Sequence, residues 1–147
     1  MQAGPDGRRY GSVNRAGAVA LLHISDPHIT VGEVGARAEQ RFAAILAAHE
    51  NLPVLLTGDL ASSGELVAYQ RIAELLDGRT YIYCPGNHDD RAALRRILGE
   101  RDVLDLPHLR IISLDSTVDG HVGGALRPEM LTLLEERIME TEAGILV

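Results

Sequence analysis

The sequence lacks several features that would place it in well-defined classes of protein. It has a single cysteine, Cys84, so an internal disulfide is excluded. No apolar run approaches the roughly 20 residues of a membrane-spanning helix. The polar, Gly- and Arg-rich stretch 1–17 has no apolar segment of the kind found in secretory signals. These absences favour a cytoplasmic protein that does not associate with a membrane.

Lysine is absent as well, and the overall charge is negative. All 14 basic residues are arginines, and 21 acidic residues bring the net charge to −7. Phosphate backbones attract clustered positive charge, so general nucleic-acid binding is not expected. An acidic balance is compatible with carboxylates gathered around a divalent cation, although solubility alone would explain it.

Apolar segments follow one another in a regular alternation of strand and helix. The 147 residues suffice for one domain, predicted over 18–147 after a flexible tail at 1–17. Strands are predicted at 18–24, 53–57, 80–84, 110–114 and 144–147, and helices at 36–48, 64–77, 90–98 and from Pro128 onward. The sequence therefore predicts an α/β fold in which βαβ units form one mostly parallel sheet flanked by helices.

A polar cluster follows each of the first four predicted strands. Asp26, Asp59, Asn87 and Asp115 stand at intervals of 33, 28 and 28 residues, and one βα crossover takes about 30 residues. Because the carboxyl ends of parallel strands meet at one edge of a sheet, we expect these clusters to converge on a single crevice.

The converging side chains form a mixed nitrogen and oxygen ligand set without thiolate. The set consists of Asp26, His28, Asp59, Asn87, His88 and Asp89. It suits Mn²⁺, Zn²⁺ or iron. A carboxylate has two oxygens, so Asp59 can bridge two cations. Two cations about 3.5–4 Å apart would generate a metal-bound hydroxide and stabilise an in-line phosphoryl displacement.

Each short motif has an ordinary structural explanation when it is taken alone. Asp-x-His occurs often by chance, Asp59 is a typical strand-end residue, and Asp89 and Asp90 are typical N-caps for the helix at 90–98. The run from Pro85 to Asp89 is more specific. The three motifs in this order and at βα spacing make a chance occurrence improbable.

With these motifs, the chain resembles the N-terminal half of a calcineurin-like metallophosphoesterase. The run Gly86 to Arg91 and the segment Leu109 to Asp115 resemble its bacterial class III cyclic-nucleotide phosphodiesterase branch. The resemblance implies an αββα sandwich and a dinuclear metal centre. In that centre Asp26 and His28 bind the first metal, Asp59 bridges both metals, and Asn87 binds the second.

The resemblance also implies roles in catalysis and substrate binding. His88 would lie near the leaving group and protonate or stabilise it, and Asp89 would orient His88 and stabilise its charge. Asn87 and His88 would face the substrate. Arg91 is a candidate contact to the substrate phosphate, the alternative being an arginine on a solvated helix face.

The sequence departs from the family pattern at its C-terminal end. The family adds metal-ligand histidines from two later motifs, and neither is found before Val147. We therefore expect a truncated domain that holds two cations poorly and is inactive or nearly so as a monomer. We also expect apolar sheet surface to be exposed, which favours self-association.

Three functions remain open at this point. The first is a metal-dependent phosphodiesterase that acts on 3′,5′-cyclic nucleotides or similar small diesters. The second keeps the chemistry but takes a phosphomonoester or a glycerophosphodiester. The third is a non-catalytic metal-binding or scaffold module.

Overall fold

The computed structural model describes residues 19–33 and 35–147. The tail predicted at 1–17 and the first residue of the predicted domain lie outside this range. Within the described residues, no helix is both long and apolar enough to cross a membrane.

Three short parallel strands form the first sheet, in the order β1-β2-β3. They are β1 (Leu22–Ser25), β2 (Val54–Thr57) and β3 (Tyr81–Cys84). Their register is unshifted, with Ser25 opposite Thr57 and Thr57 opposite Cys84. The three strands therefore end at the same level, and the loops that follow them emerge side by side. This confirms the α/β class and the parallel arrangement predicted from the spacing of the motifs.

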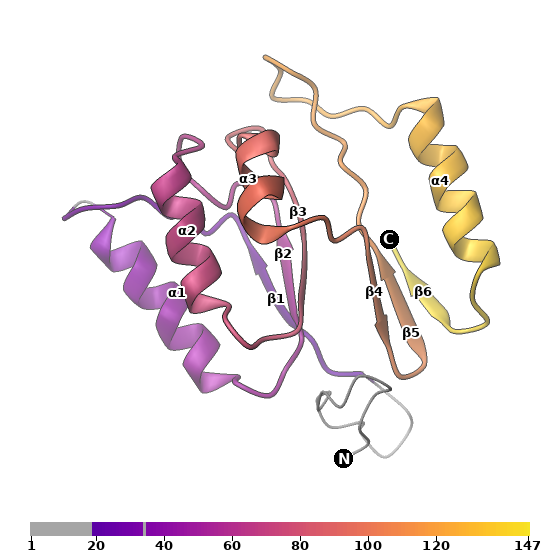
Figure 1. Cartoon of the computed structure of the whole chain (residues 1–147), viewed down its shortest axis with the longest axis horizontal. Helices are drawn as coiled ribbons and strands as arrows, with labels where there is room; N and C mark the ends of the chain where they lie inside the picture. Colours follow the sequence, from indigo (N-terminus) through magenta and orange to yellow (C-terminus); the bar gives the residue numbers. More distant parts are fainter. Residues whose placement is uncertain (1–18, 34) are drawn as a thin grey trace.

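Helices α1 (Ala36–Ala48), α2 (Leu66–Leu75) and α3 (Arg91–Leu98) lie together on one side of this sheet (Figure 1). Alternate strand residues such as Val54, Leu56 and Tyr81 are buried against them, as the two-residue period of a strand requires. The carboxylate of Asp90 accepts hydrogen bonds from the amides of Ala92 and Ala93, which confirms it as the N-cap of α3.

The rest of the chain forms a second sheet, so the predicted single sheet is divided in two. Its strands are β4 (Val103–Leu106), β5 (Leu109–Ile112) and β6 (Gly144–Leu146), with α4 (Pro128–Met139) before β6. β4 and β5 pair antiparallel, whereas β5 and β6 pair parallel. In Figure 1 this sheet lies beside the first, with β4 next to β3.

The sequence prediction missed β4 because the turn of this hairpin has an unusual composition. Leu106 pairs with Leu109, so only Pro107 and His108 connect the strands. Proline followed by a residue with positive φ is the pattern of a type II turn, and His108 has φ 67°. Glycine or asparagine is usual at that second position. Because histidine stands there, the sequence pattern did not indicate a turn.

The face of the first sheet opposite α1–α3 is partly uncovered. An open, largely apolar hollow of about 700 Å³ lies over it and is lined by both sheets. We call this the apolar hollow; its lining includes Leu21, His23, Leu55, Thr57, Cys84, Ile111, Leu114, Leu126, Leu146 and Val147. An uncovered apolar surface of this kind agrees with the exposed sheet expected from the sequence.

The apolar hollow predicts concentration-dependent association of the chain. Leu146, in β6, is 38% exposed, so Leu146→Lys puts a charge on this surface at little cost to the core. We expect sedimentation velocity at rising concentration to show association of the wild type and a shift to monomer for Leu146→Lys. Val122→Lys is the control, because Val122 is 88% exposed and does not line the apolar hollow. Equal association of all three proteins would contradict the prediction.

Candidate metal centre

The loops that follow β1 and β2 are joined to each other by backbone hydrogen bonds. The amide of His28 donates to the carbonyl of Asp59 (3.0 Å), and that of Ile29 donates to Leu60 (2.9 Å). Ile29 and Ala61 form a parallel bridge beyond the strands. The pairing of β1 with β2 thus continues past the sheet edge and carries the predicted ligands with it.

Three of the predicted metal ligands come together at this edge. One ligand atom from each of Asp26, His28 and Asp59 lies within 4.8 Å of the other two. His28 Nε2 is 3.7 Å from Asp59 Oδ2. Two carboxylates this close repel each other, and a divalent cation between them removes that repulsion. One imidazole with two carboxylates is a donor set that fits Mn²⁺, Zn²⁺ or iron.

The same three residues have strained backbones. Asp26, His28 and Asp59 have φ values of 50°, 45° and 45°, in the left-handed region that side chains other than glycine rarely adopt. Such conformations cost roughly 1–3 kcal/mol each and persist only where the surrounding structure enforces them. Their coincidence on three residues that share one cluster supports a functional interpretation of the cluster.

Gly86 allows the third loop to reach Asp59. A Cβ atom at Gly86 would lie 2.1 Å from Asp59 Oδ1 and 2.3 Å from its backbone nitrogen. The amide of His88 in the same loop donates to Asp59 Oδ1 at 3.0 Å. Asp59 is only 8% exposed, so this contact holds the carboxylate in a nearly buried position and leaves Oδ2 facing His28.

His88 reaches the site with a defined ring orientation. Its Nδ1 lies 2.9 Å from the carbonyl oxygen of Ser62, which can only accept, so Nδ1 carries the proton of this hydrogen bond. The His88 ring stands edge-on to that of His28 with 5.2 Å between centroids. Ser62 also donates its hydroxyl to the carbonyl of His28 (2.9 Å). The sequence analysis did not identify Ser62 as a support of this site.

Asp89 is placed differently from the expectation that it orients His88. Its two oxygens accept hydrogen bonds from the amides of Leu60, Ala61 and Gly86 and from the hydroxyl of Tyr69. The ring of His88 is oriented instead by the hydrogen bond that its Nδ1 donates to the carbonyl of Ser62. Adjacent residues of a turn point in different directions, so the Asp89 carboxylate lies with these amides and the Tyr69 hydroxyl although it follows His88 in the sequence.

The last two predicted site residues lie at the edge of this region. Asn87 is exposed in the turn between Gly86 and His88. Arg91, in the first turn of α3, forms ion pairs with Asp115 (3.7 Å) and Asp119. Arg91 therefore spans from α3 to the loop after β5, and the structure does not bring it into the cluster of Asp26, His28 and Asp59.

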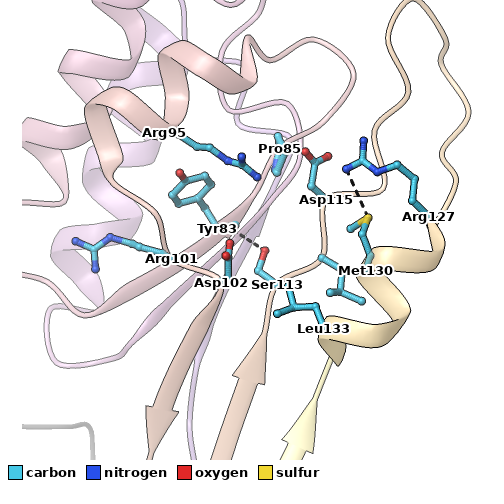
Figure 2. A pocket seen from close by; sticks show the side chains of 11 residues that line it. Tyr83, Pro85, Arg95, Arg101, Asp102, Ser113, Asp115, Arg127, Met130 and Leu133 are labelled. Atoms are coloured by element: carbon cyan, nitrogen blue, oxygen red, sulfur yellow. Dashed lines mark hydrogen bonds between the residues drawn. The ribbon is translucent and has the colours of Figure 1, made fainter. Parts of the chain in front are cut away.

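A separate small cavity, of about 110 Å³, lies between β3, α3, the segment that follows β5, and α4 (Figure 2). Arginine side chains line it together with Asp102 and Asp115, so its walls carry charges of both signs. A hydrogen bond from Ser113 to the carbonyl of Tyr83 runs across its floor. None of the predicted metal or catalytic residues lines this cavity, and the metal centre is the stronger candidate site.

Comparison with known proteins agrees with this geometry. The sequence profile of the calcineurin-like phosphoesterase family matches residues 19–135. A cAMP/cGMP dual specificity phosphodiesterase of Mycobacterium tuberculosis is 35% identical over 141 residues, which cover 80% of this chain and 44% of the relative. A 3′,5′-cyclic adenosine monophosphate phosphodiesterase of Pseudomonas aeruginosa is 29% identical, over 82% of this chain and 50% of the relative.

A third relative differs in its substrate. A probable glycerophosphodiester phosphodiesterase of Arcobacter nitrofigilis is 34% identical over 99 residues, which cover 58% of this chain and 36% of the relative. The chain spans about half the length of the curated relatives it matches. These relatives are hydrolases of phosphodiesters.

Proposed function

Because the chain belongs to the calcineurin-like phosphoesterase family, we propose that it carries the metal centre of a phosphodiesterase for 3′,5′-cyclic nucleotides. The observation that carries this proposal is the convergence of Asp26, His28 and Asp59, with His88 directly beside them. The mixed donor set fits a divalent transition metal, and the neighbouring imidazole fits acid catalysis.

Asp26, His28 and Asp59 would hold the first cation. We extend the proposal to a second cation, held by Asp59 and Asn87, with Mn²⁺, Zn²⁺ or iron as the metals. When bound, such cations supply Lewis acidity and lower the pKa of a coordinated water. Three protein ligands hold a cation weakly, so we expect modest affinity in the chain alone.

His88 supplies the proton that the leaving group needs. Its Nδ1–H is held by the Ser62 carbonyl, so Nε2 is the nitrogen available to the substrate. As water forms a new P–O bond, the ester oxygen leaves with the electrons of the broken bond and takes a proton from Nε2 of His88, and the proton that the attacking water gives up replaces it on Nε2. In our proposal Arg91 contacts the substrate phosphate after exchanging its ion pair with the exposed Asp119.

The substrate class is inferred from the relatives and from charge. Two relatives are named for cyclic nucleotides. The net charge of −7 disfavours long polyanions such as nucleic acids, so we propose a small diester. We also propose the cytoplasm as the place of action, as expected from the composition of the sequence. A glycerophosphodiester is the second candidate, because one relative with 34% identity carries that name.

The test compares three substrates with the purified chain and Mn²⁺. Cyclic AMP, a glycerophosphodiester and p-nitrophenyl phosphate are incubated with the chain, and the products are quantified by chromatography. We expect slow hydrolysis that a chelator abolishes and that is fastest with cyclic AMP. His88→Gln should lower the rate by about 100-fold or more, the usual contribution of a general acid. His121→Gln, in an exposed turn, is the control.

Each other outcome selects a different function. Faster hydrolysis of the glycerophosphodiester or of the monoester would change the substrate class and leave the metal centre intact. Mn²⁺ binding without turnover of any substrate would favour a non-catalytic metal-binding module. Hydrolysis that is indifferent to the chelator and to His88→Gln would contradict the proposal.

A further inference from the structure

The carboxylate of Asp89 connects three separate parts of the chain. Oδ2 accepts from the amides of Leu60 (3.0 Å) and Gly86 (2.9 Å), and Oδ1 accepts from the amide of Ala61 (3.0 Å). The hydroxyl of Tyr69 in α2 is the fourth donor, at 3.0 Å from Oδ1. Two carboxylate oxygens offer about four acceptor positions, so these four donors fill them.

Tyr69 holds this carboxylate from inside the core. Its side chain is fully buried, and its hydroxyl also accepts a hydrogen bond from the amide of Asp90 (2.9 Å). Burial, together with the charge of Asp89, raises the pKa of Tyr69 above its usual range, so the hydroxyl keeps its proton. The hydroxyl of Tyr69 thus both donates a hydrogen bond to and accepts a hydrogen bond from the loop that carries His88.

The donors to Asp89 are direct neighbours of the metal ligands. Leu60 follows Asp59, whose φ of 45° is strained, and Gly86 precedes Asn87 and lies against the Asp59 carboxylate. Loss of the Tyr69 hydroxyl would remove one of the two donors to Asp89 Oδ1 and the acceptor of the Asp90 amide. The loops could then relax toward less strained backbone conformations, which would pull the ligands apart.

We propose that Tyr69 is a positioning residue of the metal centre. It acts through Asp89 to keep the loop of Asp59 in register with the loop of Asn87 and His88. Tyr69 is hydrogen-bonded to Asp89 and Asp90 and to none of the proposed ligands, so its effect passes through the Asp89 carboxylate and the backbone amides bonded to it. The inference rests on the proposed function, since it presumes that Asp26, His28 and Asp59 bind a cation.

The test measures metal affinity and fold stability in the same variants. Tyr69→Phe removes only the hydroxyl. Tyr81→Phe is the matched control, because Tyr81 is also buried and donates its hydroxyl to the carbonyl of Leu98, away from both loops. Mn²⁺ binding to the 147-residue chain is followed by electron paramagnetic resonance, and urea unfolding is followed without metal. A chain with Asp59→Asn serves as the non-binding reference.

We expect Tyr69→Phe to bind Mn²⁺ about 10-fold more weakly than the wild type, as is typical when a support of a metal ligand is lost. Tyr81→Phe should bind like the wild type, although both variants lose a similar part of their stability. Equal affinity of Tyr69→Phe and Tyr81→Phe would overturn the positioning role and leave the metal centre standing. Binding no stronger in the wild type than in Asp59→Asn would instead overturn the proposed metal centre itself.

Hydrogen exchange in the wild type decides the matter if Tyr69→Phe does not fold. If the hydrogen bonds of Tyr69 favour metal binding, then metal binding must stabilise those hydrogen bonds by the same free energy. We expect saturating Zn²⁺ to slow exchange of the Asp90 amide, which donates to Tyr69, by about 5-fold or more. The Gly99 amide, which donates to Arg95 at the end of α3, is the internal reference. Unchanged exchange of the Asp90 amide would overturn the proposal.

Discussion

Alanine at position 86 is expected to destroy the metal centre and to destabilise the fold severely. The new Cβ would lie 2.1 Å from Asp59 Oδ1 and 2.3 Å from the Asp59 nitrogen, far inside van der Waals contact. The Asp59 nitrogen cannot move away without a large free-energy cost, because the amide of the next residue, Leu60, is hydrogen-bonded to Asp89. We expect a loss of about 3 kcal/mol or more in the free energy of unfolding, at the upper end of overpacking effects.

Urea unfolding and Mn²⁺ titration of Gly86→Ala check this expectation. Gly123→Ala is the control, because a Cβ at Gly123 meets nothing within 4 Å. It should keep wild-type stability and wild-type affinity. Wild-type Mn²⁺ affinity in Gly86→Ala would mean that the Asp59 and Gly86 loops can separate without loss of the site, contrary to the packing described above.

The sequence carried enough information to bring three of the proposed metal ligands together. Strand, polar cluster and helix repeat at βα spacing, and the register of β1, β2 and β3 brings their ends level, as that spacing predicts. The approach of Asp26, His28 and Asp59 follows from this topology alone. The regular spacing of strands along the sequence was sufficient to predict this approach, because Asp26, His28 and Asp59 each stand within three residues of the end of a strand.

The hydrogen bonds that hold the proposed ligands in place could not be predicted from the sequence in the same way. The resemblance implied that Asp89 orients His88, whereas the hydrogen-bond partners of the Asp89 carboxylate are up to 29 residues away. Such contacts depend on how α2 packs on the sheet, which local periodicity does not specify. One signal was available: Tyr69 lies on a buried helix face, and a buried tyrosine hydroxyl usually has a hydrogen-bond partner.

Substitution of Asp59 by asparagine is expected to separate metal binding from stability. The amide oxygen can still accept the hydrogen bond from the His88 amide, but the charge that faces His28 and Asp26 is gone. Mn²⁺ affinity should fall more than about 100-fold, since even changes beside a metal ligand cost about 10- to 100-fold. The metal-free chain should be at least as stable as the wild type, because repulsion between two carboxylates is removed.

Mn²⁺ titration and urea unfolding in the presence of a chelator measure the two effects separately. Asp77→Asn, an exposed substitution of the same chemistry, should alter neither. The opposite pattern, a metal-free Asp59→Asn chain that unfolds as easily as Gly86→Ala, would make the Asp59 carboxylate a structural support of its loops. The left-handed backbone at Asp26, His28 and Asp59 argues against that pattern. Backbone strain and like charges gathered in one cluster lower the stability of the fold, and they are retained where a bound cation compensates for them.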